Sequence, residues 1–462
     1  MKNSVEALEK EHVGKLLIKI SLPAILGLVV QSLYNIIDTI YVGHAIGGIG
    51  IAGMTVVYPI QILIVGLSNL FSIGGAAMIS MALGRGERLE ARKIASSVMC
   101  FTIILSIILS VVCQIFTKNI SYLFGANAQV AQYSVAYTSI MYPGIVVTMA
   151  LMTYYAFLRS EGKQKVVMIT SITSVALNII LAPIFLWGIK LGMHGVSLAT
   201  LLSQIVSLII VIRYYQSGKV VVRIVKKYFW IYPSIIYRST MLGMSSFLQM
   251  IGNAIINILV NHFAMHYGGS YGLASYGLAY RVIVILFMPI LGFMQGGQPI
   301  IGYAWGQENY GRVRSALNKM YQYGLILSIV FCILAILFAK QITMLFGTNP
   351  IMMKDTPYYL KALVFALPLM CFQAISSGYF QYTGNVWKST ITTIFRQYIC
   401  YIPVIFIFST LWGMQGFIYS YTVSNVISGV FIFILMRREY GKRLKKRSSK
   451  FKTDMIKESL EG

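Results

Sequence analysis

Long hydrophobic runs separated by short polar connectors form the dominant pattern along this chain. About twelve runs occur, and each is close to the roughly 20 residues that a helix needs to cross a membrane. A backbone group in lipid must find its hydrogen-bond partner within its own segment, so the pattern predicts helices. The predicted helices cover residues 16–41, 50–79, 94–116, 132–158, 166–187, 193–212, 240–264, 274–303, 318–339, 358–382, 390–410 and 414–436.

The two halves of the chain match each other at an offset of 222 residues. Gly74 and Gly75 align with Gly296 and Gly297 at that offset. Six helices per half is an even number, so both halves enter the membrane in the same direction and the repeat is of the parallel kind. We therefore predict an all-α integral membrane protein with two six-helix bundles. Its parts are an N-terminal bundle (1–212), a cytoplasmic linker (213–239), a C-terminal bundle (240–436) and a basic cytoplasmic tail (437–462).

Composition supports this fold class, because 57% of the residues are hydrophobic and only 11% are charged. A soluble chain carries about 25% charged residues. The five cysteines all lie in hydrophobic runs without metal-ligand spacing, so we expect neither a disulfide nor a metal site. The polar start of the chain carries three glutamates and no cleavage site follows, so we expect no cleavable signal peptide.

The net charge of +25 is distributed unevenly between the connectors. Lys and Arg gather before the first helix, in alternate connectors and in the tail, which by the positive-inside rule predicts cytoplasmic termini. This distribution favours a multi-pass protein of the cytoplasmic membrane and argues against nucleic-acid binding. We expect the basic tail to contact anionic membrane lipids, and we expect a monomer.

Only one of the thirteen acidic residues, Asp38, lies inside a hydrophobic run. A carboxylate at membrane depth costs roughly 2.5–3.5 kcal/mol on insertion scales, so it indicates function. Gln31, Tyr34 and Asn35 precede Asp38 at helical spacing on one face. We expect this face to line a substrate cavity, with hydrogen bonding between helices as the alternative. In the second half Asp38 aligns with Val260, so the carboxylate is not duplicated.

Four stretches resemble the MATE (multidrug and toxic compound extrusion) transporters, in a MepA-like or DinF-like branch. The first is P-A-x(6)-Q-x-x-x-N-x-x-D-x-x-x-x-G, from Pro23 to Gly43. The second is Met288–Arg314, which contains QGGQPIIGYAWG. Leu177–Gly188 and Gly192–Thr200 resemble the family's fifth and sixth helices. The resemblance covers essentially all twelve predicted helices.

The resemblance implies a cation-coupled antiporter, without a cofactor, that exports lipophilic or cationic small molecules. The family's coupling residues match Asp38, Asn178 and Thr200, and its helix-bending proline matches Pro23. This chain has Ala182 where the family pattern has a second carboxylate. One anionic ligand weakens a Na⁺ site, so proton coupling is favoured while Na⁺ at the three matched residues stays open.

Other functions are less compatible with the sequence. A flippase for lipid-linked sugars of the same superfamily is the alternative; it would use cationic cavity residues to hold pyrophosphate. A membrane-embedded enzyme or a receptor is a rival of another class, but no catalytic constellation or Walker motif occurs, so we expect no enzyme. For Arg281, a basic residue in a hydrophobic run, we expect a structural role, with substrate contact as the alternative; Arg396 is a similar case.

Overall fold

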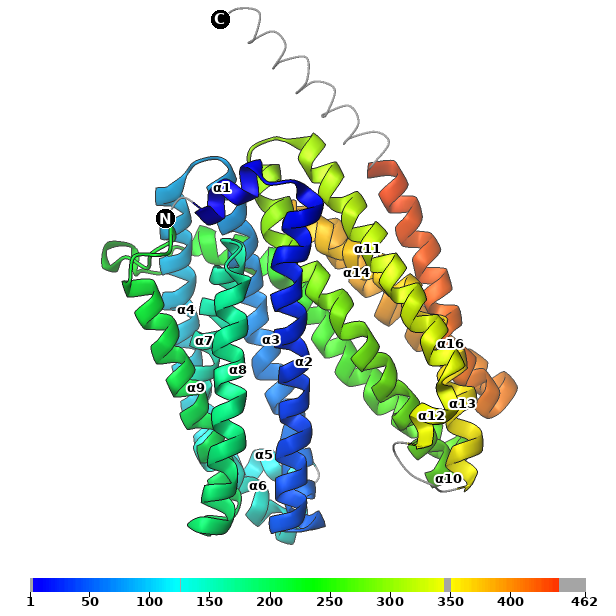
Figure 1. Ribbon diagram of the computed structural model, residues 1–462. Helices are drawn as coiled ribbons and strands as arrows, with labels where there is room; N and C mark the ends of the chain where they lie inside the picture. The colour runs from blue at the N-terminus through cyan, green and yellow to red at the C-terminus, as the bar shows by residue number, and fades with distance from the viewer. Residues whose placement is uncertain (1–2, 125, 345–349, 440–462) are drawn as a thin grey trace, which may run out of the picture. The chain divides into compact units, whose positions relative to one another are not determined.

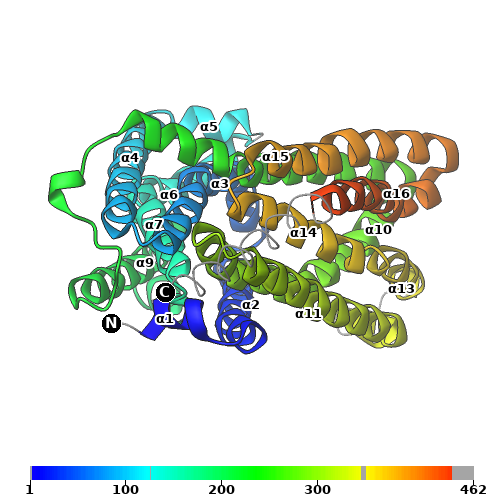
Figure 2. The same cartoon turned by 90° about the horizontal axis from the view of Figure 1, so that it is seen from above.

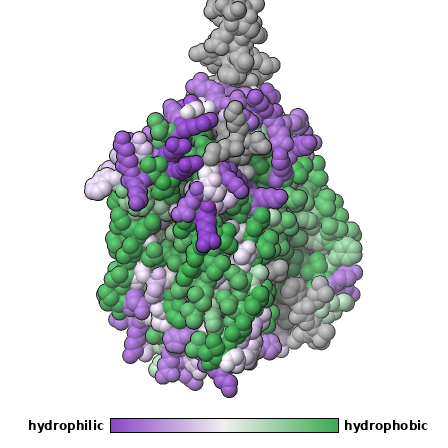
Figure 3. Space-filling model, turned by 60° about the vertical axis from the view of Figure 1, so that its left-hand side comes forward, coloured by the Kyte–Doolittle hydropathy of each residue, from purple (hydrophilic) through white to green (hydrophobic). Residues whose placement is uncertain are grey.

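The structure is a computed structural model that describes residues 3–124, 126–344 and 350–439. These residues form helices joined by short connectors, with no strand among them (Figure 1). The basic tail predicted for 437–462 lies outside the described residues from position 440 onward. On the face seen in Figure 3, hydrophobic residues form a broad band, and hydrophilic residues gather at its two ends. The predicted all-α membrane fold is confirmed at this level.

Within its described residues, the first half of the chain contains six hydrophobic spans. They are α2 (Val13–Ala45), α3 (Gly48–Gly84), α4 (Arg88–Ile115), the bent pair α6 (Ala128–Met141) and α7 (Ile145–Ser160), α8 (Gln164–Pro183) with the π-helical turn η1 (Ile184–Gly188), and α9 (Met193–Gln216). Short helices α1 (Asn3–Lys10) and α5 (Thr117–Leu123) flank them. Figure 2 shows α3, α4, α6, α7 and α9 grouped together, and contacts join α3 to each of α4, α6 and α7.

The second half repeats this organisation within the described residues. Its helices are α10 (Pro233–Gly306), α11 (Tyr310–Leu337), α12 (Ala339–Met344), the bent pair α13 (Pro350–Val364) and α14 (Leu367–Tyr382), α15 (Val386–Ile394), the π-helical turn η3 (Phe395–Tyr401) and α16 (Ile402–Glu439). The long helix α10 is interrupted at Gly269, and α16 is kinked at Trp412 and Gly413. With these breaks counted, the second half also provides six spans.

The backbone conformation reproduces the sequence repeat. Gly47 precedes the second span with a φ of 87°, and Gly269, 222 residues later, has a φ of 60°. Such φ values favour glycine, because a Cβ clashes with the neighbouring carbonyl there. The positive-φ pairs at repeat-related positions are Gly47 and Gly269, Gly86 and Glu308, Gly162 and Gly384, and Gly192 and Gly413. The connectors of the two halves therefore turn in the same way.

Two compact units form, and each includes half a helix from the other part of the chain. Unit 1 consists of Met1–Ala7 and Leu26–Phe247, and unit 2 of Leu8–Ile25 and Leu248–Gly462. Helix α2 passes from unit 2 to unit 1 after residue 25, and α10 passes from unit 1 to unit 2 after residue 247. These two crossing points are 222 residues apart, so the exchange follows the repeat.

Close helix contacts fix both exchanged segments. A Cβ added to Gly296 would lie 3.0 Å from the Cα of Ser21, so α10 approaches the N-terminal half of α2 backbone to backbone. Gly74 of α3 meets Ser239 in the N-terminal part of α10 in the same manner, and the Ser239 hydroxyl donates to the Phe71 carbonyl at 2.7 Å. Small residues permit such approaches in membrane proteins. Both glycines belong to the repeated glycine pairs of the sequence.

The linker between α9 and α10 is held on unit 1 by a buried ion pair. The Glu161 carboxylate is fully buried and accepts hydrogen bonds from the backbone amides of Val222 (2.7 Å) and Val221 (3.2 Å). The Lys163 Nζ lies 2.6 Å from the same carboxylate. Ser96 accepts a further hydrogen bond from the linker amide of Val225 at 2.9 Å. The linker is thus an ordered part of unit 1.

Candidate functional site

Three acidic side chains are buried among the residues whose side chains the structure describes. Glu161 and Glu439 lie at or just beyond helix ends, and each pairs with a lysine. Asp38 is different, because it lies within the long apolar helix α2 and is only 3% exposed. Such a carboxylate is costly to hold in its charged form unless neighbours hydrogen-bond to it. Its immediate surroundings therefore determine what it can do.

Asn178 of α8 is the neighbour that faces the Asp38 carboxylate. Its amide is oriented with the nitrogen toward Asp38 and the oxygen toward Thr200, because the reverse orientation would set two acceptors against each other. The amide nitrogen donates to Asp38 Oδ1 at 3.0 Å. Asn178 is itself 1% exposed, so the hydrogen bond lies in a dry environment. It stabilises the charged form of Asp38.

Thr200 of α9 completes the polar cluster. The Asn178 carbonyl oxygen accepts from the Thr200 hydroxyl and from its backbone amide, both at 3.2 Å. The same hydroxyl lies 3.1 Å from the Val196 carbonyl oxygen, so one hydroxyl proton has two acceptors. We call Asp38, Asn178 and Thr200 the polar triad. It joins α2, α8 and α9, and all three residues belong to unit 1.

A tyrosine of α6 extends the site. Tyr137 lies close enough to Asp38 for the two groups to interact electrostatically. Its hydroxyl accepts a hydrogen bond from Gln61 Nε2 of α3 at 3.3 Å. Because that bond uses only a lone pair of the hydroxyl, the Tyr137 proton stays available for donation. Helices α3 and α6 thus add neutral polar groups on a further side of the carboxylate.

A hydrophobic cluster closes one end of the polar triad. Its buried members are Val42, Tyr137, Leu186, Met193 and Val196. Val42 lies one helical turn beyond Asp38 on α2, and Val196 lies one turn from Thr200 on α9, so the cluster is adjacent to the triad. The Tyr41 ring packs edge-on against Trp187 at 5.7 Å beside it.

Ala182 occupies a position near the polar triad without providing an oxygen ligand. It lies one turn after Asn178 on α8 and is fully buried, so it faces the same region with a methyl group. Among the described residues, no group of three or more His, Cys, Asp or Glu side chains could hold a metal ion. A single carboxylate with an amide and a hydroxyl is sufficient to bind and release a proton. It is a poor set of ligands for a metal cation.

The structure brings together the three residues predicted for ion coupling. The predicted cavity residues Gln31, Tyr34 and Asn35 lie in the helical part of α2, but their side chains are outside the described residues. Pro23 lies within α2, which continues through it as one helix, two residues before the helix passes between the units. The roles assigned to these residues remain predictions.

Sequence reasoning missed Tyr137 and Gln61. The sequence could have indicated Gln61, because a carboxamide inside the predicted hydrophobic run 50–79 needs a polar partner. It could not have indicated Tyr137, since that residue is one of 31 tyrosines in the chain. Its relevance follows only from the packing of α6 against α3 and α9.

Comparison with known proteins identifies the family. The MatE family matches residues 23–184 and 242–407, which is more than half of the chain and one match in each repeat. The chain belongs to the MatE family. A similar protein is the multidrug export protein MepA of Staphylococcus aureus (strain MRSA252), which is 26% identical over 432 residues. That alignment covers 93% of this chain and 95% of MepA.

Solved structures of MATE proteins share the fold. One in the straight conformation has a TM-score of 0.90 and 25% identity, covering 96% of this chain and 99% of its own. One in the bent conformation has a TM-score of 0.91 and 24% identity, covering 97% and 99%. The expected family and the twelve-helix fold in two bundles are therefore confirmed. As a MatE family member the chain is a multi-pass membrane protein, and its relatives are transporters and not enzymes.

Proposed function

We propose that this protein is a proton-coupled antiporter that exports amphipathic, often cationic compounds across the cytoplasmic membrane. The multidrug export named for its MepA relatives supports the export of small molecules. The observation that carries the coupling proposal is the polar triad, in which a 3% exposed carboxylate receives a hydrogen bond from a neutral amide. A carboxylate held in this way can gain and lose a proton as its hydration changes.

The ligand set favours a proton over Na⁺. The Asn178 amide turns its nitrogen toward Asp38, so its oxygen is directed away from the carboxylate. Sodium would need several oxygen atoms around it, and Ala182 supplies none from its side chain. A Na⁺ mode would require the amide to rotate and additional oxygen ligands to be recruited. A proton needs only the Asp38 oxygen atoms.

Helix α2 provides a route from protonation to conformational change. Its C-terminal half carries Asp38 within unit 1, while its N-terminal half belongs to unit 2. Protonation removes the charge that the Asn178 amide stabilises, which weakens the attachment of α2 to α8. Pro23 interrupts the hydrogen-bond ladder of α2 near the crossing point, so the helix bends there most easily. In outline, proton entry from outside favours substrate release, and proton loss inside favours substrate binding.

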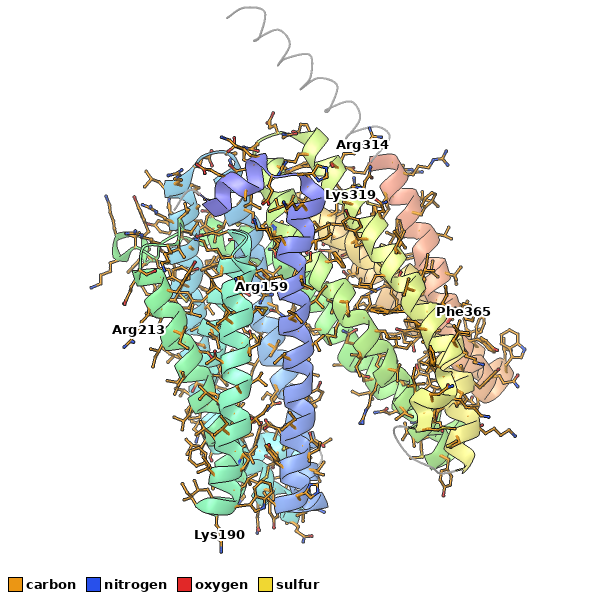
Figure 4. The ribbon with its side chains drawn as sticks, viewed as in Figure 1. Arg159, Lys190, Arg213, Arg314, Lys319 and Phe365 are labelled. Atoms are coloured by element: carbon orange, nitrogen blue, oxygen red, sulfur yellow. The ribbon has the colours of Figure 1, made fainter. Side chains whose placement is uncertain are left out.

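The arrangement of positive charge supports cytoplasmic termini. Lys190 lies at the end of unit 1 where α8 and α9 are joined, and Arg213 lies toward the opposite end of α9 (Figure 4). The basic linker that follows Arg213 begins at the same end of unit 1, which the positive-inside rule assigns to the cytoplasm. We propose that the protein works there as a monomer surrounded by membrane lipid. Its partners are small lipophilic or cationic molecules.

Transport by purified protein in liposomes tests the proposal. We expect an imposed proton gradient to drive rhodamine 6G against its concentration gradient, and an imposed Na⁺ gradient to drive little movement. Asp38→Asn keeps the shape of the side chain but cannot carry a proton, so proton-driven transport should fall at least ~10-fold. Glu87→Gln, which removes an exposed acid elsewhere in unit 1, is the matched control and should transport normally. Undiminished proton-driven transport by Asp38→Asn would refute the coupling assignment.

A further inference from the structure

Unit 2 contains a charged residue in a membrane span that the coupling site does not use. Arg396 is the second residue of the π-helical turn η3, inside the hydrophobic segment Val386–Glu439. π-helical turns recur at functional sites, because they shift one residue out of the regular helical register. A charged side chain at membrane depth is rare and usually serves a pathway or a ligand. Arg396 therefore requires a physical explanation.

Arg396 lies next to a cluster of four tyrosines in unit 2, two of which interact with it. Tyr276 and Tyr280 of α10 are stacked with ring centroids 6.2 Å apart. The Tyr421 ring of α16 meets Tyr280 edge-on at 6.1 Å and Tyr401 of η3 at 5.7 Å. Arg396 interacts electrostatically with the hydroxyls of Tyr280 and Tyr421. The result is a guanidinium beside a tyrosine cluster, with Arg396 and Tyr280 partly exposed.

The partners of Arg396 within the described part of the chain are neutral. The buried carboxylate of unit 2, Glu439, pairs with Lys388. The ion pairs and hydrogen bonds of the described residues include none from the Arg396 guanidinium, so it does not cap a carbonyl group there. Arginine keeps its charge in proteins, so it cannot relieve burial by losing a proton. It requires water or an external anion.

The internal repeat shows that this site has the opposite polarity to the polar triad. Asp38 aligns with Val260 at the offset of 222, so unit 2 lacks the acid. Thr200 aligns with Tyr421 at the offset of 221 that Gly192 and Gly413 define. One repeat thus combines a buried acid with an amide and a hydroxyl, while the other combines a base with tyrosines. The duplicated scaffold has acquired two different polar centres.

We propose that Arg396 and the tyrosine cluster form a recognition site for the carboxylate or phosphate group of an aromatic amphiphile. The planar guanidinium presents paired donors that match the oxygens of such a group. The partly exposed Tyr280 can add a further hydrogen bond through its hydroxyl and can contact an aromatic body with its ring. This inference rests on the proposed export function and extends its substrates from cations to zwitterions and anions.

Equilibrium binding of two matched dyes to purified protein tests the inference. Rhodamine 19 carries a free carboxylate, and rhodamine 6G carries the same group as an ethyl ester. We expect Arg396→Gln to weaken rhodamine 19 binding at least ~10-fold, the usual scale for losing a charge-assisted hydrogen bond, and rhodamine 6G binding less than ~2-fold. Arg396→Lys should restore part of the loss. Arg438→Gln, which removes an exposed arginine at the end of α16 in unit 2, is the matched control and should change neither affinity.

The outcomes separate the possible ligands and functions. Phosphatidylglycerol and phosphatidylcholine can be added as competitors of rhodamine 19. If phosphatidylglycerol displaces the dye from wild-type protein but not from Arg396→Gln, and phosphatidylcholine displaces it from neither, the site also binds a lipid phosphate. Arg396-dependent binding without export of either dye would refute the export function and leave the site intact. Equal effects of Arg396→Gln on both dyes, or the same loss of rhodamine 19 binding in Arg438→Gln, would overturn the inference.

Discussion

Asn178 is the side chain that connects Asp38 of α2 with α8 and α9. Its amide nitrogen donates to the Asp38 carboxylate at 3.0 Å, and its oxygen accepts from Thr200 on the other side. If Asp38 is the coupling residue, as we propose, removing this amide should impair transport.

Asn178→Ala should lower proton-driven transport at least ~10-fold, because it removes the hydrogen bond between α8 and the Asp38 carboxylate. Loss of a hydrogen bond to a charged group costs roughly 1.5–3 kcal/mol. Thr200→Val leaves the Asn178 donor in position and should lower transport less than ~3-fold in the same liposome assay. Undiminished transport by Asn178→Ala would separate this amide from coupling.

Helix α2 is the element that carries part of the polar triad in unit 1 and begins in unit 2. Arg312 of α11 donates to the carbonyl oxygens of Leu8 and Glu11, both at 2.8 Å, just before α2 begins. A Cβ added to Gly292 would lie 2.9 Å from the Ile25 backbone nitrogen, so α10 and α2 pack closely at this point. These contacts hold the first half of α2 in unit 2, while Asp38 holds the second half in unit 1.

The linker is a second element whose packing has a measurable consequence. Glu161→Gln leaves Lys163 and two linker amides around a neutral group, and breaking a buried ion pair costs about 3–5 kcal/mol. We expect the unfolding temperature in detergent to fall by about 5–15 °C. The control is Glu87→Gln in the connector before α4, where the Arg85 guanidinium hydrogen-bonds at 2.8 Å and lowers the pKa of an exposed carboxyl. That variant should shift the temperature by less than ~2 °C, and an equal shift in both would contradict a specific role for the buried pair.

Much of the whole molecule could be predicted from the sequence. Hydropathy located twelve spans, because lipid imposes the same length and hydrogen-bonding constraints on each. Asp38 was conspicuous because a carboxylate is rare in such a run, and the family resemblance joined Asn178 and Thr200 to it. The family, the helical fold and the repeat were confirmed by the comparisons and the backbone.

The remaining features depend on packing that periodicity does not encode. A hydrophobic pattern shows that α2 is a helix but not that its first half packs in unit 2, since either bundle would bury the same apolar face. Tyr137 could not be distinguished from other tyrosines before α6 was placed beside Asp38. Arg396 stood out as a charge, but the tyrosine cluster beside it combines α10 with the much later segment of η3 and α16.

Proton release on substrate binding is the most direct test of the central claim. If Asp38 exchanges a proton for a cationic substrate, adding saturating rhodamine 6G to purified protein in weakly buffered solution should release about one proton per bound dye, by linkage. Asp38→Asn should bind the dye and release none. Wild-type protein that binds rhodamine 6G without releasing a proton, at any pH between about 5 and 9, would contradict proton coupling through Asp38.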